Sequence, residues 1–185
     1  NACKRLQFSL KTESDISIEI KKLNINKPTT FNNIPAKILV DSCDISTPFL
    51  TKYLNDSIFN SIFPSSLKLA DVTPVHKKDE RTNKGNYRPI SILPSISKIF
   101  ERTMQDQILL HIDKYLSPFL CGFRKGYSTQ HCLIVMLERW KKALDKSKIV
   151  GAILTDLSKA FDCLNHDLLI AKLEAYNFES TSLAY

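Results

Sequence analysis

The sequence lacks several features that would assign it to particular classes of protein. Its 185 residues contain only four glycines, no internal repeat and no low-complexity linker. No run of about 18 apolar residues is present, and no basic-then-apolar leader precedes a cleavage site. These absences indicate neither a membrane span nor secretion, so we expect an intracellular protein without a membrane partner.

Metal-binding and redox motifs are also missing. The five cysteines are odd in number and irregularly spaced, without a C-x-x-C pair, and the four histidines show no spacing typical of metal ligands. We therefore expect reduced thiols and structural histidines, with His166 in the turn that starts a helix.

The composition that is present indicates a folded, basic chain. An apolar content of 43% and a charged content of 24% are typical of a globular domain with a real core. The 26 Lys and Arg residues outnumber the 19 Asp and Glu, and the net charge of +7 favours a polyanionic partner without identifying it. The chain lacks an initiator Met and stops at "STSLAY" within a helical pattern, so we expect both ends to be cut from something longer.

Hydrophobic periodicity predicts helices that are separated by loops and one hairpin. Apolar residues at helical spacing predict a helix over 45–62, and "LADVTPVHKKD" alternates like a strand before a charged turn and a second strand near Tyr87. A long amphipathic helix is predicted from Pro94, and Ser128 offers a cap for the next helix, after the loop "FLCGFRKGYS".

The segment 149–155 is predicted to be an apolar strand buried on both faces, and a helix restarts near Asn165. The strand runs into Asp156, and polar groups at the carboxyl end of such a strand are often used for chemistry. Asp is also common in turns and caps, so a purely structural role for Asp156 remains open.

Six blocks of sequence, in order, resemble the reverse transcriptases of non-LTR (LINE-type) retrotransposons. The segment "AILTDLSKAFD" resembles the first catalytic motif of that family: a hydrophobic strand, Asp, three residues and Ala-Phe-Asp. The other blocks are "NIPAKIL" at 33–39, "FPSSLKLADVTPVHKKD" at 63–79, "GNYRPISILPSISKIFE" at 85–101, "CGFRKGYSTQHCL" at 121–133 and "LNHDLLIAKL" at 164–173. The ordered set spans about residues 20–175 and is far more specific than any one block.

The resemblance implies an α+β fold that comprises the fingers and a partial palm of a right-hand polymerase, truncated after the first catalytic motif. It implies an N-terminal helical extension at 1–62, fingers at 63–148 and the start of the palm at 149–185. The implied activity is RNA-directed DNA synthesis with Mg²⁺, deoxynucleoside triphosphates, an RNA template and a DNA primer, and the family is expected in cytoplasm and nucleus.

The resemblance also assigns roles to three residues around the first catalytic motif. Asp156 matches a ligand of a two-metal site, and the backbone carbonyl of Leu157 is expected to help. Phe161 matches the aromatic ring that lies under the incoming sugar and excludes a 2′-hydroxyl. Plain core packing is the alternative for Phe161. Asp162 belongs to the motif, but no chemical role is assigned to it.

Cations on the hairpin match the part of the fingers that closes on a triphosphate. The resemblance supports Arg88 most firmly as a nucleotide-binding residue and does not decide between Lys77 and Lys78. The alternative for the lysines is a solvated turn that keeps an edge hairpin from aggregating.

Three residues of the Gly-bearing loop form a second set of candidates. Arg124, Lys125 and Ser128 are candidates for contacts with template phosphates, because such contacts need donors rather than base readout.

Two departures from the family pattern limit what the chain can do. The segment "PTTFNN" at 28–33 stands where the family has a Gly-rich, Asp-bearing turn, and no Asp-Asp pair is present to complete the metal site. We therefore expect this chain alone to be inactive. A non-catalytic RNA-binding remnant is the main alternative, and an unrelated basic interaction domain would require six accidental matches.

Overall fold

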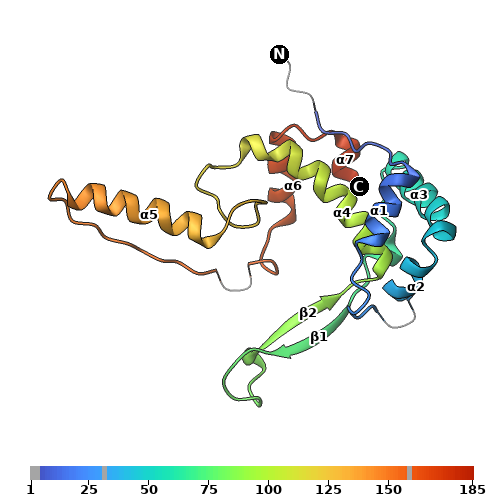
Figure 1. Ribbon diagram of the computed structural model, residues 1–185, viewed down its shortest axis with the longest axis horizontal. Coiled ribbons are helices and arrows are strands. Elements are labelled where there is room, and N and C mark those ends of the chain that lie inside the picture. Colours follow the sequence, from blue (N-terminus) through green and yellow to red (C-terminus); the bar gives the residue numbers. More distant parts are fainter. Residues whose placement is uncertain (1–4, 31–32, 158–159) are drawn as a thin grey trace. The chain divides into compact units, whose positions relative to one another are not determined.

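The computed structural model describes residues 5–30, 33–157 and 160–185, and these ranges contain seven α-helices and one two-stranded sheet (Figure 1). The helices are α1 (Glu13–Lys21), α2 (Ala36–Asp41), α3 (Cys43–Phe59), α4 (Ser95–Ile112), α5 (Thr129–Leu144), α6 (His166–Ala175) and α7 (Ser180–Ala184). The strands are β1 (Asp71–His76) and β2 (Tyr87–Ile92), and 3-10 turns cover Ser65–Leu67, Lys84–Asn86 and Asp113–Tyr115. This mixture fits the expected α+β class.

Within the described ranges, no helix combines the length and the apolar character that crossing a bilayer requires.

The chain forms two compact units that do not follow the order of the sequence. The first comprises Asn1–His111 together with Leu173–Tyr185, and the second comprises Ile112–Lys172. The predicted boundaries after residues 62 and 148 divide the chain by function rather than by packing, so that division stays a prediction.

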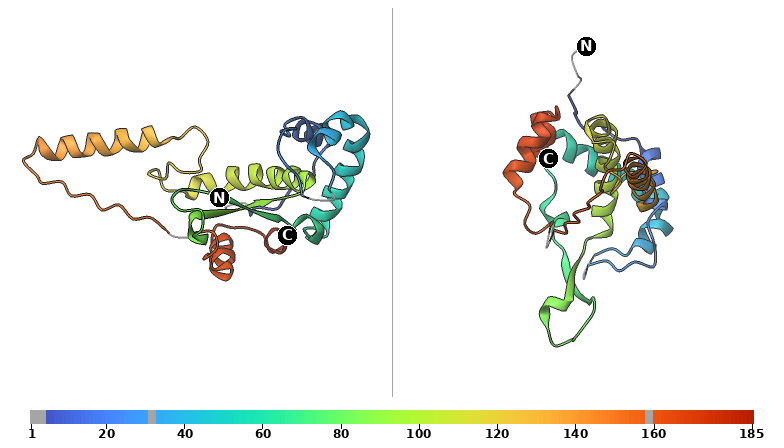
Figure 2. Two further views of the ribbon diagram at one scale, coloured as in Figure 1. Left: turned by 90° about the horizontal axis from the view of Figure 1, so that it is seen from below. Right: turned by 90° about the vertical axis from the view of Figure 1, so that its left-hand side faces the viewer.

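The core of the first unit lies where α1, α3 and α4 pack together (Figures 1 and 2). Ile16 and Ile20 of α1, Leu54 of α3 and Phe100 of α4 are fully buried there. Burying one such side chain contributes roughly 1.5–3 kcal/mol. These helices therefore form a stable base for the hairpin that follows α3 in the sequence.

Helix α3 confirms the helix predicted over 45–62, but its apolar residues do not all lie on the buried face. Leu50 and Leu54 point into the core, whereas Phe49 is 73% exposed. The inward positions Thr47 and Thr51 are buried, and their hydroxyls donate to backbone carbonyls one turn earlier at 2.6 and 2.8 Å. Small side chains with satisfied hydroxyls let α3 pack closely without an unpaired polar group.

Segments from the two ends of the sequence pair within the first unit. Leu6 and Phe178 form a parallel β-bridge, and the backbone N–H of Phe8 donates to the Ser182 hydroxyl at 3.1 Å. The Ser57 hydroxyl also donates to the hydroxyl of Tyr185 at 3.0 Å. The C-terminal turns are thus part of the same packed body as α1 and α3.

Strands β1 and β2 confirm the predicted basic hairpin. They form an antiparallel pair (Figure 1). Val75 lies opposite Arg88, and His76 lies opposite Tyr87. One further backbone bond, from Lys77 N–H to Asn86 O at 2.8 Å, extends the ladder past β1. Helix α4 follows the hairpin and confirms the long helix predicted from Pro94, which is itself buried.

The second unit confirms one predicted helix and corrects one predicted strand. Helix α5 begins after Ser128, as the cap predicted. The segment 149–155 is not a strand: it is extended but unpaired, and Ile149 and Ile153 are 99% and 94% exposed. A strand needs ladder partners on its edges, and none of the described residues supplies one. The prediction that this segment is buried on both faces is therefore wrong for this chain.

Helix α6 confirms the helix expected near Asn165. The Asn165 side-chain oxygen accepts a hydrogen bond from the backbone N–H of Leu168 at 3.0 Å, which is the usual cap interaction. His166 is the first residue of the helix, as predicted.

Candidate catalytic and nucleotide-binding residues

Asp156 lies at the end of the unpaired segment 149–155, and its side chain is exposed. No group of three or more metal-ligating side chains occurs among the residues that the structure places. Leu157 is also exposed. The alternative in which Asp156 caps a following turn involves residues 158–159, which lie outside the described residues. Among the residues that the structure describes, the accessible carboxylate of Asp156 thus belongs to no ligand cluster of the kind that a two-metal centre needs.

Phe161 is 81% exposed. Core packing, the alternative explanation for this ring, therefore does not hold in this chain. The ring and the Asp156 carboxylate, five positions earlier, are both exposed and can both contact a ligand. Residues 158–159 between them lie outside the described residues.

The hairpin brings Lys77 and Arg88 close to each other. Arg88 lies opposite Val75, and Lys77 follows Val75 by two positions while its N–H still bonds to Asn86. Side chains two positions apart on a strand point to the same face, and diagonal neighbours across a ladder lie about 7 to 8 Å apart. Lys77 and Arg88 therefore present two exposed cations on one face of the hairpin.

Lys78 has a different environment from Lys77. It lies beyond the last ladder bond, in a bend, and its Nζ atom is 3.9 Å from Oδ2 of Asp79. Asp79 adopts a positive φ of 61°, which turns the chain away from the strand direction. Both partners are exposed, so the pair contributes little to stability. Asp79 nevertheless gives Lys78 a local counter-ion. The strand pairing therefore favours Lys77 over Lys78 as the lysine that acts together with Arg88.

The loop before α5 uses Arg124 for its own structure. Its guanidinium donates to the Asp113 carboxylate at 2.7 Å and to the Ser117 carbonyl at 3.3 Å, and it lies 4.5 Å from the ring centroid of Tyr127. Only 11% of the side chain is exposed. Sequence reasoning assigned this arginine to the template, and in this structure its donors are directed inside the loop.

The other two residues of this loop differ in how accessible they are. The Ser128 hydroxyl lies 3.0 Å from Nδ1 of His131, and the Ser128 N–H donates to the same nitrogen at 3.2 Å. Ser128 and His131 thus organise the start of α5. Lys125 is exposed and forms no ion pair with a described residue, so it is the member of the set that is free for a phosphate.

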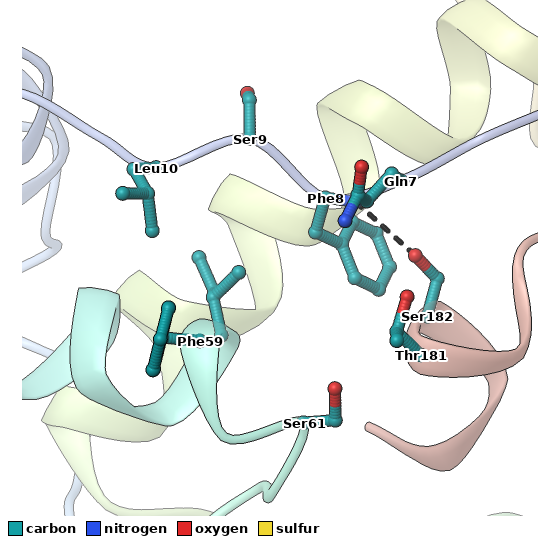
Figure 3. A pocket seen from close by; sticks show the side chains of 9 residues that line it. Gln7, Phe8, Ser9, Leu10, Phe59, Ser61, Thr181 and Ser182 are labelled. Atoms are coloured by element: carbon teal, nitrogen blue, oxygen red, sulfur yellow. Dashed lines mark hydrogen bonds between the residues drawn. The ribbon is translucent and has the colours of Figure 1, made fainter.

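A pocket of about 410 Å³ in the first unit lies beside the N-terminal segment, the end of α3 and the start of α7 (Figure 3). Phe8, Phe59 and Ser182 are among its lining residues, and the hydrogen bond from Phe8 to Ser182 runs along one side (Figure 3). None of its lining side chains is an acid, a base or a thiol. The described residues of this pocket therefore offer no ionisable side chain that could act as a general base or hold a metal ion by its charge.

Sequence reasoning missed a second group of cations, around α4. Lys98 and Arg102 stand four positions apart on this helix and line a cleft together with Lys27. Their i, i+4 spacing was a usable signal, because residues so spaced share one helix face. Lys27 is distant in sequence, and only the fold brings it to that face.

Comparison with known proteins agrees with the motif order. Residues 75–184 match the model of a family described as reverse transcriptase (RNA-dependent DNA polymerase). The chain is 29% identical over 177 residues to a probable RNA-directed DNA polymerase from transposon BS of Drosophila melanogaster, which covers 91% of this chain and 19% of that protein. It is 30% identical over 176 residues, or 90% of this chain and 19% of the relative, to the RNA-directed DNA polymerase from mobile element jockey of the same species.

A third relative extends the same pattern. The probable RNA-directed DNA polymerase from transposon X-element of Drosophila melanogaster is 32% identical over 130 residues, 68% of this chain and 14% of that protein. The chain thus spans less than a fifth of the length of these curated relatives.

Proposed function

Because the chain belongs to the reverse transcriptase family, we propose that it is the fingers and the start of the palm of an RNA-directed DNA polymerase from a non-LTR mobile element. The observation that carries the proposal is the family match over residues 75–184, which includes both the hairpin and the first catalytic motif. The partners of the whole polymerase would be an RNA template, a DNA primer and deoxynucleoside triphosphates. Its work would take place in cytoplasm and nucleus.

The hairpin would hold the triphosphate of the incoming nucleotide. Lys77 and Arg88 share one exposed face, so both can approach one polyanion at once. Arginine suits a two-point contact with phosphate oxygens, and lysine adds a compact point charge. Positioned cations of this kind stabilise negative charge that builds up during phosphoryl transfer.

Phe161 and Lys125 would act on other parts of the substrate. The exposed ring of Phe161 would lie under the sugar and exclude a 2′-hydroxyl by shape. Lys125, exposed in the loop before α5, would contact template phosphates, while Arg124 and Ser128 would hold that loop in place.

Reverse transcriptases generally use divalent metal ions, and the part of this chain that the structure describes does not complete such a site. Mg²⁺ prefers carboxylate oxygens, and the described residues form no cluster of three or more candidate ligands around Asp156. Asp156 would therefore contribute one ligand, helped by the Leu157 carbonyl, and the other carboxylates would come from sequence outside this chain. This chain alone should not synthesise DNA.

Primer extension on an RNA template tests the proposal. In a polymerase that carries this segment and the rest of its palm, Asp156→Asn should abolish extension with little change in template affinity, because Asn keeps the shape of the side chain and removes its charge. The matched control Asp145→Asn, at an exposed carboxylate just after α5, should extend normally. Robust extension by Asp156→Asn, or by the 185-residue chain itself, would place the catalytic site elsewhere.

A non-catalytic RNA-binding remnant of such an element is the second candidate, and the net charge of +7 suits such RNA binding. The downstream genomic sequence separates the two. An open frame with an aromatic-x-Asp-Asp turn supports the polymerase, and stop codons or frameshifts before that turn support the remnant.

A further inference from the structure

A cleft in the first unit is lined by cations on two sides. One wall is the loop after α1, which carries Lys27, and the opposite wall is the face of α4 that carries Lys98 and Arg102. The cleft has a volume of about 310 Å³. None of the comparisons, and none of the motifs in the sequence, assigns a ligand to it.

The two cations of α4 are held in place without being neutralised. Lys98 Nζ donates to the backbone carbonyl of Pro28 at 3.4 Å, and Arg102 Nη1 donates to the carbonyl of Lys22 at 3.3 Å. Both acceptors are uncharged. None of the three cations of the cleft forms an ion pair with any residue that the structure describes. The positive charge of α4 is thus positioned in advance without a direct ion pair to a described residue.

The cleft also contains one acid, Glu101, which only partly offsets this charge. Partial desolvation raises the pKa of Glu101, while a hydrogen bond from the Ser97 hydroxyl at 3.3 Å and the nearby Lys98 act in the opposite direction. Even with Glu101 ionised, three cations against one carboxylate leave a net positive cleft.

The remaining lining residues suit a phosphate group better than a nucleobase. Gln105 and Asn24 contribute side-chain amides, and Leu23 and Ala36 form buried apolar walls. No aromatic ring is among the lining residues that the structure describes. Base recognition in single strands relies on stacking against aromatic rings, whereas backbone phosphates need only positive charge and donors.

We infer that this cleft is a second phosphate-binding site, separate from the hairpin, that holds the sugar–phosphate backbone of a single-stranded nucleic acid. The inference rests on the proposed function in one respect, since a polymerase brings such a strand to the chain. The site reads charge and not sequence. It therefore contributes affinity for any single strand and confers no preference among bases.

The test is fluorescence anisotropy with a labelled oligouridylate and the 185-residue chain. The triple variant Lys27→Ala, Lys98→Ala, Arg102→Ala removes the cations of the cleft. Each phosphate contact with a single strand contributes about 0.7 to the slope of log affinity against log salt, so the slope should fall by about 2. With the non-ionic part of binding unchanged, that slope corresponds to a loss of about 100-fold at 0.1 M salt.

A matched triple, Lys21→Ala, Lys37→Ala, Lys52→Ala, removes the same charge from exposed positions outside the cleft. It should weaken binding by less than about 5-fold, the equivalent of one contact. Equal losses in the two triples would show that only diffuse charge matters and would overturn the inference.

Two more variants guard against loss of folding. The charge-keeping double Lys98→Arg, Arg102→Lys should bind within about 3-fold of the wild type, and Glu101→Gln should bind about 5-fold more tightly because one negative charge leaves the cleft. Circular dichroism melts identify any variant that is unfolded. Unchanged affinity in a folded Glu101→Gln chain would contradict the inference.

Competition with inorganic phosphate separates the two sources of a phosphate group. Millimolar phosphate should leave the oligouridylate bound to the wild type. If phosphate at that level displaces the oligouridylate from the wild type but has no effect on the cleft triple, the cleft is a site for free phosphate. These binding results do not depend on synthesis. If primer extension fails as described above but the cleft variants bind as expected, only the proposed function is overturned. If primer extension succeeds but the cleft variants do not bind as expected, only the inference about the cleft is overturned.

Discussion

The hairpin assigns different roles to two adjacent lysines, and this difference can be measured. Lys77 continues the ladder on the face that carries Arg88, whereas Lys78 lies in the bend beside Asp79. If the face with Lys77 and Arg88 holds a triphosphate, Lys77→Ala and Arg88→Ala should each weaken its binding. Lys78→Ala should have a much smaller effect.

Exposure sets the expected magnitude. Lys77 and Arg88 are both exposed, so the value for a surface ion pair applies, at most about 1 kcal/mol for each contact. Each single variant should therefore weaken binding by up to about 5-fold, and the double variant by up to about 25-fold if the contacts are independent. Lys78→Ala should change the dissociation constant by less than about 2-fold.

The assay is an NMR titration of the chain with dTTP, which suits weak binding and reports on folding in the same spectra. Repeating it at high salt should reduce the effect of Lys77→Ala, since exposed charge pairs are screened. Two results would refute the reasoning: a loss in Lys78→Ala as large as in Lys77→Ala, or a Lys77→Ala, Arg88→Ala double variant that binds like the wild type.

Three further predictions concern the sugar, the cleft and the core. In a complete polymerase, Phe161→Val should admit ribonucleotides far more readily while deoxynucleotide incorporation stays measurable; equal discrimination by both enzymes in competition assays would remove the ring from the site. Because the pKa of Glu101 is raised in the folded state, the neutral carboxyl stabilises the fold below the ordinary pKa of glutamate, and this stabilisation is lost as the pH rises through the raised pKa. The free energies of unfolding of the wild type and of Glu101→Gln, measured in urea, should therefore agree at about pH 4. At about pH 7 the Gln variant should be the more stable of the two. A difference that does not vary with pH would contradict this. Leu54→Ala, at a fully buried position, should lower the free energy of unfolding by about 2–5 kcal/mol, whereas Leu69→Ala, at a side chain that is 72% exposed, should stay within about 0.5 kcal/mol in the same experiment.

Local signals in the sequence were sufficient for most of the helices and for the hairpin. Ser128 and Asn165 stand directly before α5 and α6, and caps of this kind depend on only a few neighbouring residues. The hairpin was predictable because alternation and a polar turn lie within one short segment.

Signals that depend on distant partners were misleading. The apolar run 149–155 reads as a buried strand, yet burial requires neighbours that the described residues do not provide. Arg124 reads as a free cation, and its acceptor Asp113 lies 11 positions away in another turn. Lys27 joins Lys98 only through tertiary packing. Periodicity reports which face of an element is apolar, and it does not report what covers that face or which charges meet there.

The joining of the two ends of the first unit has a consequence for biosynthesis. Phe8 bonds to Ser182, 174 positions later, so the N-terminal segment leaves the ribosome long before its partner exists. At a translation rate of 5–20 residues per second, the wait is roughly 10 to 35 s. Helices α1, α3 and α4 can pack during that time, but the sheet bridge and the α7 contacts cannot. A nascent chain arrested before residue 178 should therefore expose the segment around Leu6 and Phe8 to proteases and chaperones, and that segment should become protected only once α7 has emerged.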